Sequence, residues 1–530
     1  MVNRFTHYKA TKDLQELAKQ AIVLSDSKQM TPERLLHYKA EACGYKLLYG
    51  TERITDQVLR SLTALGEEAK AVEKMIQMQN GEIVNYITGF PSENRPALHT
   101  ATRDFFDHQK TTEKAKAASA LSRKEIEKLQ NFLEKIDREN NIHQLIVIGI
   151  GGSEQGPRAN YYALQKYLIP KREVYFISNV DPDDAAAVLR RIDPTHTLVV
   201  TISKSGTTLE TETNEKLVRH HFQKKGILTQ DHFISITMPG TPMDNKKEYG
   251  EVFYIWDWIG GRLSTTSMVG GVVLGFACGF ALFWEFLQGA HAMDQAALSP
   301  HLSENISLLS ALIGIWNHNF LHYPTVAIIP YSQALQYYPA HLQQVDMESN
   351  GKSIDQQGEF VDFTTGPILW GSLGTNAQHS YFQLLHQGTA SVPLLMIGFA
   401  KSQYGEDIEV QGTTSQQKLL SNLFAQSLAL ATGGPAENPN RFFPGNRPTT
   451  ILLGEQLTPF TLGALLSFYE HRVAFQGFIW GINSFDQEGV QLGKVVANQF
   501  ISAFGKKKEK QKEASSPFIE AYFTHLDDFQ

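Results

Sequence analysis

Two segments rich in glycine and hydroxyl side chains could bind a phosphate. The first, Gly149–Pro157 (GIGGSEQGP), follows an apolar run directly, so its backbone N–H groups and the Ser153 hydroxyl can face an anion, and Gly152 lies in the turn. The second, Ser203–Thr211 (SKSGTTLET), places hydroxyl groups and one cation before a helix. Its hydroxyl side chains are those of Ser203, Ser205, Thr207 and Thr208, and its cation is Lys204. A phosphate or a sugar phosphate is therefore the expected ligand.

Other interpretations of these segments need no phosphate. The glycines of the first segment do not fit the GxGxxG pattern, and Asp181 lies 30 residues beyond Gly151 instead of about 20, so a dinucleotide site is not favoured. A purely structural turn stays open. In the second segment, Thr207 and Glu210 have the spacing of a capping box, which needs no ligand. A capping box would leave Lys204 and the remaining hydroxyl groups unexplained.

The segment Leu342–Ser353 (LQQVDMESNGKS) carries a carboxylate suited to acid–base work. Gln344 and Glu348 are four residues apart, which places them on one face of a helix that Asn350–Gly351 would end. Glu348 is a candidate general base, and Gln344 could orient it or the substrate. The competing interpretation is an ordinary solvated glutamate.

Further charged side chains stand apart along the sequence. Arg262 lies in WIGGRLSTTS, just before a long apolar run, and could stabilise a developing anion; a structural arginine is the alternative. His379 and Lys494 are candidate proton carriers, with surface positions as their alternative. His318 and His322 are four residues apart, but no glutamate follows as in HExxH, so no metal site is predicted.

The segments between these motifs predict an α/β protein. Short β-branched apolar runs alternate with helical patterns, which is typical of parallel sheets covered by helices. The first series, after a charged helix at Glu113–Glu139, consists of Leu145–Ile150, Val174–Asn179 and Thr197–Ser203. The second consists of Thr325–Pro330, Val392–Ala400 and Phe478–Ile482. We expect two doubly wound parallel sheets with additional helices and a C-terminal appendage.

Four regions follow from this pattern. Residues 105–285 would form a small α/β domain, and residues 286–505 a large one. Residues 10–80 show amphipathic helical periodicity and no obvious strand, so residues 1–104 are predicted to form a helical segment. Residues 506–530 form a tail whose mixed charges indicate a solvated end of the chain.

Composition excludes several classes of protein. With 530 residues, 42% of them hydrophobic, the chain can bury large cores, and its net charge of −7 provides no basic field for nucleic acid or an anionic membrane. Cys43 and Cys278 have no metal-site or disulfide-framework spacing, and the N-terminus lacks a secretion signal, so the cytoplasm is expected. Met268–Trp284 is uncharged, but in a chain of mean hydropathy −0.26 it predicts a buried core helix.

Taken in order, the motifs resemble the glucose-6-phosphate isomerase (phosphoglucose isomerase) family. The matching segments are NRPALHTATR (Asn94–Arg103), GIGGSEQGP, SNVD (Ser178–Asp181), SKSGTTLET, GGRLS, LQQVDMESNGK, GTNAQH and NSFDQEGVQLGK. The resemblance implies two sugar-isomerase-type (SIS) domains in a homodimer, with the active site at the junction of domains and subunits and residues 1–104 packed on the larger domain. It also implies reversible conversion of glucose 6-phosphate to fructose 6-phosphate in glycolysis and gluconeogenesis.

The resemblance assigns roles to the candidate residues. Ser153, Ser203, Lys204, Ser205 and Thr208 would hold the phosphate, and Gly152 would allow its close approach. Glu348 would move a proton between C1 and C2 through a cis-enediol(ate), with Arg262 stabilising the negative charge. His379, lent by the neighbouring subunit, and Lys494 would open the sugar ring. Gln344 and Gln487 would position the sugar. No cofactor and no metal are implied.

The chain departs from the family pattern beside these positions, at Gly206, Leu263, Ser372, Ala377 and Gln491. Two other functions stay open. One is a regulator that binds a sugar phosphate without chemistry. The other is an isomerase of a different phosphosugar, such as mannose 6-phosphate.

Overall fold

The computed structural model of this chain describes residues 4–107, 112–435, 437–508, 516–527 and 529. Its internal contacts divide the chain into two units, residues 1–485 and residues 486–530. The first unit contains both large β-sheets, and the second contains two helices. The two units are described separately.

The first sheet is parallel throughout, with strand order β6-β5-β7-β8-β9. Its strands are β5 (Gln144–Ile148), β6 (Glu173–Ile177), β7 (Thr197–Ile202), β8 (Phe233–Thr237) and β9 (Glu251–Tyr254). The strand runs predicted near residues 145, 174 and 197 are confirmed. Because β6 lies on one side of β5 and β7 on the other, the winding reverses between β5 and β7. The carboxyl ends of these two strands form the switch point, where open α/β sheets bind ligands.

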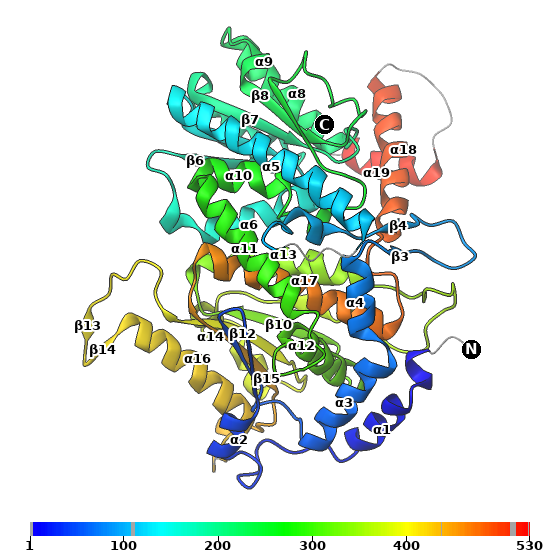
Figure 1. The fold of residues 1–530 in the computed structure, drawn as a ribbon, viewed down its shortest axis with the longest axis vertical. Coiled ribbons are helices and arrows are strands. Elements are labelled where there is room, and N and C mark those ends of the chain that lie inside the picture. Colours follow the sequence, from blue (N-terminus) through cyan, green and yellow to red (C-terminus); the bar gives the residue numbers. More distant parts are fainter. Residues whose placement is uncertain (1–3, 108–111, 436, 509–515, 528, 530) are drawn as a thin grey trace. The chain divides into compact units, whose positions relative to one another are not determined.

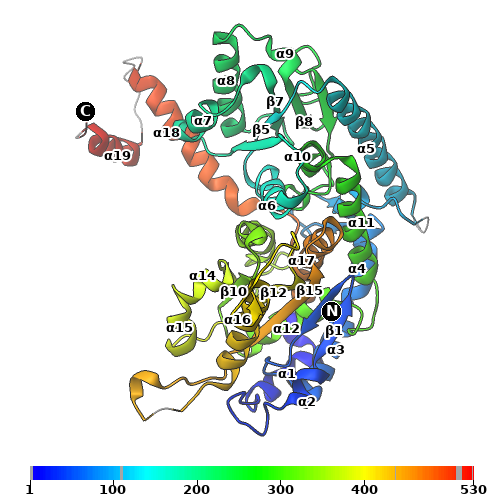
Figure 2. The ribbon, with the colours of Figure 1, turned by 90° about the vertical axis from the view of Figure 1, so that its left-hand side faces the viewer.

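Helices cover both faces of the first sheet, as Figures 1 and 2 show. One face packs on α7 (Pro182–Leu189) and α8 (Leu209–Lys224), and α9 (Thr229–His232) precedes β8. The other face packs on α5 (Glu113–Glu139), α6 (Gln155–Ala163) and α10 (Met268–Cys278). This double cover explains why the strands are almost continuously apolar. The predicted helix Glu113–Glu139 is confirmed with both ends.

The second sheet has strand order β1-β2-β15-β12-β10-β11. Its parallel strands are β10 (Thr325–Pro330), β11 (Ile368–Trp370), β12 (Leu394–Lys401) and β15 (Thr449–Gln456). β2 (Tyr45–Leu48) adds antiparallel to β15, and β1 (Lys39–Ala42) pairs antiparallel with β2. The order β11-β10-β12-β15 repeats the order β6-β5-β7-β8 of the first sheet. The N-terminal segment therefore extends the larger sheet.

Two expectations about strands are wrong. Residues 10–80 contain the hairpin of β1 and β2, whose turn residues Cys43 and Gly44 both have positive φ, 50° and 82°. Phe478–Ile482 is not a strand, because its residues up to Trp480 end helix α17 (Pro459–Trp480). Since α17 is buried on every side, its sequence lacks the amphipathic period that distinguishes a helix from an apolar strand.

The apolar run at residues 268–284 belongs to two helices. α10 ends at Cys278, Gly279 adopts a φ of +93°, and α11 (Phe280–Ala296) follows. All of α10 is buried, which confirms a core location, but the single helix expected from the sequence is interrupted. No helix within the described residues is long and apolar enough to cross a membrane.

The remaining helices complete the two units. The N-terminal helices are α1 (Lys9–Ala18), α2 (Pro32–His37), α3 (Asp56–Glu68) and α4 (Ala71–Gln79), followed by the small hairpin β3 (Ile83–Asn85) and β4 (Arg95–Pro96). The larger sheet is covered by α12 (Ile306–Ile315), α13 (Tyr338–Gln343), α14 (Gly374–Gln378), α15 (Phe382–Gln387), α16 (Ser415–Thr432) and α17. A short hairpin of β13 (Glu409–Val410) and β14 (Thr413–Thr414) precedes α16. Residues 486–530 contain α18 (Gln491–Lys508) and α19 (Pro517–Asp527).

The predicted domain boundaries stay predictions. The first sheet lies wholly within residues 105–285, whereas the second combines strands from residues 1–104 with strands from residues 286–505. The division between compact units falls after Phe485, and α18 runs across the predicted boundary at residue 505.

A buried cluster of charges joins the N-terminal segment to the core helices. Arg103 is fully buried and donates from Nε and Nη2 to the carboxylate of Asp294 on α11, at 2.8 and 2.7 Å. Its Nη1 donates to Glu470 on α17 at 2.8 Å and to the hydroxyl of Thr266 at 3.3 Å. Thr266 lies four residues beyond Arg262, so the cluster supports the loop that carries this candidate residue.

The start of α16 is capped by a carboxylate of the chain itself. The Asp407 oxygens accept hydrogen bonds from the backbone N–H groups of Ser415 and Gln416, at 3.0 and 2.9 Å. These bonds lower the pKa of Asp407 to about 2. A negative charge therefore already lies at the N-terminus of the helix that follows β12.

Candidate active site

Hydroxyl groups gather beyond the carboxyl end of β7, at the switch point of the first sheet. The Ser203 and Thr208 hydroxyl oxygens are 2.9 Å apart, and Ser205 Oγ accepts a hydrogen bond from the Thr207 hydroxyl at 3.0 Å. The residue before α8 is Thr208, and its side chain caps no backbone N–H group. The alternative of a capping box of Thr207 and Glu210 is therefore wrong, and the binding of an anion by these hydroxyl groups at the helix start stays a prediction.

Lys204 joins this turn to the segment before Arg262. Its Nζ donates to the carbonyl oxygens of Asp257 and Ile259, at 2.7 and 2.9 Å. Burial of the ammonium group, with a smaller effect of the nearby Arg95, lowers the pKa of Lys204 to about 8. The ammonium group lacks a carboxylate partner among these contacts, so an incoming phosphate would supply the compensating charge.

Gly206 is one of the departures from the family pattern, and its surroundings account for a glycine here. It adopts a φ of +67°, and a Cβ atom would lie 2.9 Å from Cβ of Thr241. A larger side chain would collide with Thr241 and strain the backbone. Within this turn the Thr207 N–H donates to Ser205 Oγ at 3.2 Å, while Ser203 contacts Thr208.

The turn after β5 packs against the Arg262 loop. A Cβ atom on Gly152 would lie 2.1 Å from the carbonyl oxygen of Gly261 and 2.5 Å from the backbone nitrogen of Arg262. The structure thus gives Gly152 a packing role, while its predicted contact with phosphate stays untested. Ser153 ends the short 3₁₀ turn Gly151–Ser153 and is half-buried beside this contact.

Gln344 reaches the same turn from the larger domain. Its Nε2 would lie 3.2 Å from a Cβ atom built on Gly151, whose φ is +60°. Its Oε1 is buried and makes no hydrogen bond within the described residues. The turn after β5, the Arg262 loop and the Gln344 segment therefore meet within the unit 1–485.

Glu348 lies in a π-helical turn, Gln344–Glu348, that continues α13. The sequence predicted an ordinary α-helix with Gln344 and Glu348 on one face. In the π-helical turn each backbone hydrogen bond spans five residues instead of four. Such turns often carry functional side chains. Glu348 is half-buried, and its Oε2 atom makes no hydrogen bond among the described residues. This oxygen is available to accept a proton.

Arg262 lies against the other oxygen of Glu348. The side chain of Arg262 is 1% exposed, and its Nη1 lies 3.4 Å from Glu348 Oε1. Its Nε donates to Ser349 Oγ at 2.7 Å, and its Nη2 donates to the Ser484 carbonyl oxygen at 2.6 Å. The arginine is thereby fixed by hydrogen bonds, with its positive charge directed at the carboxylate.

Residues that the sequence analysis did not single out support this pair. Lys352 Nζ donates to the carbonyl oxygens of Glu348 and Ser349, both at 2.8 Å. Asp346 accepts hydrogen bonds from Tyr469 at 3.0 Å and Arg472 at 2.9 Å, which ties the π turn to α17. Asp346 and Lys352 stand inside the LQQVDMESNGK motif, so the motif was the available signal.

The other predicted residues are not brought to this pair by the described contacts. His379 follows α14, and its side chain is exposed. Lys494 is exposed on α18, and Gln487 precedes the short turn Glu488–Val490, both in the separate unit 486–530. Their predicted roles therefore stay predictions.

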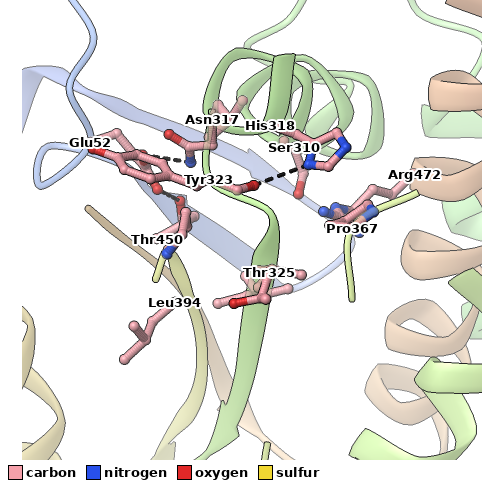
Figure 3. A pocket seen from close by; sticks show the side chains of 15 residues that line it. Glu52, Ser310, Asn317, His318, Tyr323, Thr325, Pro367, Leu394, Thr450 and Arg472 are labelled. Atoms are coloured by element: carbon pink, nitrogen blue, oxygen red, sulfur yellow. Dashed lines mark hydrogen bonds between the residues drawn. The ribbon is translucent and has the colours of Figure 1, made fainter. Parts of the chain in front are cut away.

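A polar cavity lined in part by Arg472 is too small to be a substrate site. Figure 3 shows Glu52, Asn317, His318, Thr450 and Arg472 around it, with the Asn317 amide bonded to Glu52 at 3.0 Å. Burial raises the pKa of Glu52 to about 7. At about 40 Å³ the cavity accommodates roughly one water molecule, far less than a hexose phosphate.

Comparisons with known proteins agree with this geometry. The family model described as phosphoglucose isomerase matches residues 48–517. The glucose-6-phosphate isomerase of Protochlamydia amoebophila (strain UWE25) is 62% identical over 528 residues, covering 99% of this chain and 98% of the relative. That of Chlamydia felis (strain Fe/C-56) is 55% identical, covering 94% and 92%. The crystal structure of a glucose-6-phosphate isomerase from Chlamydia trachomatis D/UW-3/Cx matches with a TM-score of 0.95 and 49% identity over 100% of both chains.

Proposed function

The chain belongs to the phosphoglucose isomerase family, and we propose that it interconverts glucose 6-phosphate and fructose 6-phosphate. The family and the α/β fold expected from the motifs are confirmed. The observation that carries the reaction to this chain is the pair of the buried Arg262 and the half-buried Glu348, in which one carboxylate oxygen faces a cation and the other makes no hydrogen bond within the described residues.

The phosphate of the sugar binds at the switch point of the first sheet. The hydroxyl groups of Ser203, Ser205 and Thr208 and the start of α8 supply hydrogen-bond donors, and the Lys204 ammonium group supplies charge. Ser153 adds a hydroxyl from the neighbouring turn after β5. The phosphate would lie at these loops, with C1 and C2 of the sugar at Glu348.

The chemical step is a proton transfer between adjacent carbons. With glucose 6-phosphate in its open form, Glu348 Oε2 takes the proton from C2, and the electrons of that C–H bond form the C1–C2 double bond while the C1 carbonyl oxygen becomes an enediolate oxygen. The hydroxyl proton on O2 then moves to O1, C2 becomes a carbonyl, and Glu348 returns its proton to C1. Arg262 stabilises the negative charge of the intermediate. The substrate and the product have the same overall oxidation level, so the reaction needs no redox cofactor. A positioned base of this kind contributes about 10² to 10⁴ in rate.

Ring opening is assigned to His379 and Lys494, which move protons between the ring oxygen and the C1 hydroxyl. The exposure of His379 on one chain is compatible with its insertion into the site of a second copy, which makes the enzyme a homodimer. Gln344 and Gln487 position the sugar hydroxyl groups. A cytoplasmic location stays a prediction.

The test is a coupled dehydrogenase assay of glucose 6-phosphate formation, comparing wild type with Glu348→Gln. We expect turnover to fall by at least two orders of magnitude while binding of a sugar-phosphate inhibitor is retained. Glu359→Gln, at an exposed glutamate of the following loop, is the matched control and should be fully active.

Each other outcome selects a different conclusion. Equal turnover in wild type and Glu348→Gln would reject Glu348 as the base. Binding of fructose 6-phosphate without turnover by wild type would indicate a sugar-phosphate-binding regulator. A higher kcat/KM for mannose 6-phosphate than for glucose 6-phosphate would identify an isomerase of another phosphosugar.

A further inference from the structure

The short hairpin of β3 and β4 brings an arginine to the turn after β7. Arg95 begins β4 and pairs with Asn85 on β3. Its side chain is only 16% exposed. The sequence analysis gave Arg95 no role, although it stands in NRPALHTATR, because Asp257, its contact in the fold, lies 162 positions away.

Arg95 and Lys204 donate hydrogen bonds to the same oxygen atom. Arg95 Nη1 lies 2.5 Å from the carbonyl oxygen of Asp257, and Lys204 Nζ lies 2.7 Å from it. The two nitrogens are therefore no more than about 5.2 Å apart. Two positive charges at this separation repel each other, so their arrangement favours an anion beside them.

Further hydrogen bonds fix both cations on one segment. The N–H of Leu98, just beyond β4, donates to the carbonyl oxygen of Trp258 at 3.0 Å. Lys204 Nζ donates to the carbonyl oxygen of Ile259 at 2.9 Å, in addition to that of Asp257. The carbonyl groups of residues 257–259 thus hold the hairpin and the turn after β7 together. The place of Arg95 beside Lys204 is set by the fold.

Glu93 compensates part of this charge. Its Oε2 accepts hydrogen bonds from Arg95 Nη2 and from Asn85 Nδ2. The guanidinium therefore joins the Glu93 carboxylate through one arm and the Asp257 carbonyl through the other. Burial lowers the pKa of Lys204 most, and Arg95 lowers it further, whereas Glu93 and the Asp257 carboxylate raise it by less. Of these three charges, Arg95 has the largest effect at Lys204.

We propose that Arg95 is a positioning residue for the phosphate of the sugar: held on the carbonyl oxygen that also holds Lys204, it adds a second positive charge beside the turn after β7 and raises the affinity of this turn for a phosphate dianion. Glu93 limits that charge. The inference rests on the proposed function, which places the phosphate at this turn. It assigns Arg95 no part in the proton transfer at C1 and C2.

The ion pair of Arg95 and Glu93 allows a test by sign. If the pair served only to hold the hairpin, Arg95→Gln and Glu93→Gln would both weaken the binding of a phosphate ligand. An electrostatic role predicts opposite effects. Arg95→Gln removes a cation and leaves the Glu93 carboxylate uncompensated, whereas Glu93→Gln leaves the whole charge of Arg95 to act on the ligand.

The probe is sorbitol 6-phosphate, which has the six-carbon chain and the phosphate but no carbonyl group to isomerise. It is titrated calorimetrically into the full-length protein at pH 7 and low ionic strength. We expect Arg95→Gln to weaken binding about tenfold and Glu93→Gln to strengthen it about threefold, with the double variant between them. Arg60→Gln and Glu73→Gln, at exposed positions of α3 and α4, change the net charge equally and should bind as wild type does.

The pH dependence supplies a readout that a structural role would not move. Affinity should fall above the Lys204 pKa of about 8, where the ammonium group loses its proton. Without the repulsion of Arg95 the ammonium group persists to higher pH, so the fall should start at a higher pH in Arg95→Gln. It should start at a lower pH in Glu93→Gln. KM for glucose 6-phosphate should follow these affinities, while kcat changes little.

Equal affinity in wild type and Arg95→Gln would overturn the inference, as would weaker binding in both variants with an unmoved pH profile. Should Arg95→Gln fail to fold, Glu93→Gln decides alone, and an unchanged or weaker affinity in it would overturn the inference. The titration needs no turnover, so it stays informative if the isomerase reaction is absent. A wild-type protein that does not bind the probe would reject the phosphate site and this inference together.

Discussion

The buried Arg262 and the half-buried Glu348 form a pair in which Nη1 of the guanidinium lies 3.4 Å from Oε1 of the carboxylate. This separation is longer than an ordinary N–H···O hydrogen bond, but it still lies within the distance of an ion pair. The hydrogen bonds from Arg262 to Ser349 and Ser484 fix the guanidinium in this position. The second carboxylate oxygen, Oε2, makes no hydrogen bond within the described residues. In the mechanism proposed above, this oxygen would receive the substrate proton, and Arg262 would stabilise the enediolate charge.

Arg262→Lys should reduce kcat by about 10² to 10³-fold without unfolding the protein. A lysine keeps the charge but cannot reproduce the planar set of donors that bonds Ser349 and Ser484 while facing Glu348. The measurement is steady-state turnover, with circular dichroism to verify folding. Arg441→Lys, at an exposed arginine, is the control, and an active Arg262→Lys would show that charge alone suffices.

Gly152→Ala should lower stability by about 1 to 3 kcal/mol and reduce turnover, because the new Cβ atom would collide with the Gly261 carbonyl and displace the Arg262 backbone. Urea unfolding gives the first quantity and the coupled assay the second. Gly434→Ala is the control, since a Cβ atom there meets nothing within 4 Å. Wild-type stability in Gly152→Ala would contradict the packing contact.

The affinity for phosphate ligands should depend on the protonation of Lys204. Its pKa in the free protein is about 8, lowered by burial, and a bound phosphate dianion favours the charged ammonium group and raises that pKa. Affinity should therefore be constant just below pH 8 and fall by up to tenfold per pH unit above it. Inhibitor binding from pH 7.5 to 10 measures this, and Lys204→Arg should remove the break near pH 8. A flat profile for wild type would exclude Lys204 from the phosphate site.

Arg103→Met should destabilise the protein by about 3 to 5 kcal/mol, because the buried carboxylates of Asp294 and Glu470 would lose their cation. The transition midpoint in urea should fall accordingly. Arg190→Met, at an exposed arginine, should change stability little. A small effect of Arg103→Met would mean that the two carboxylates become protonated or find other partners.

Subunit complementation tests the role of His379. Homodimers of His379→Ala and of Glu348→Gln should both be nearly inactive. If one subunit lends His379 to the site that contains the Glu348 of the other, a refolded equal mixture should recover about a quarter of wild-type activity, since half of the dimers contain one intact site. A mixture that stays inactive would place both residues in the same subunit's site.

The sequence predicted three of the five strands of the first sheet, because β5, β6 and β7 are short apolar runs ending at glycine or hydroxyl residues, and it did not single out β8 and β9. It missed the β1–β2 hairpin since Cys43-Gly44 is not one of the usual Asn-Gly or Asp-Gly turn pairs. It mistook the end of α17 for a strand because a helix buried all round has no polar face.

The sequence could predict which side chains are candidates for the site, but not which residues they contact in the fold. Spacing and motif identified Glu348 and Arg262. Ser484, which accepts a hydrogen bond from Arg262, lies 222 positions away in the sequence, and the packing of Gly152 on Gly261 depends on two loops from different strands. Such partners follow from the tertiary fold alone.

The first four strands of each sheet lie in the same order, a common arrangement of doubly wound folds, so each sheet has a helix start at the corresponding position. At the start of α8 the N-cap side chain bonds no backbone N–H group, whereas at the start of α16 the chain's own Asp407 accepts two backbone hydrogen bonds. A phosphate at α16 would have to displace and repel a carboxylate, so of these two positions only the one at α8 suits an anionic ligand.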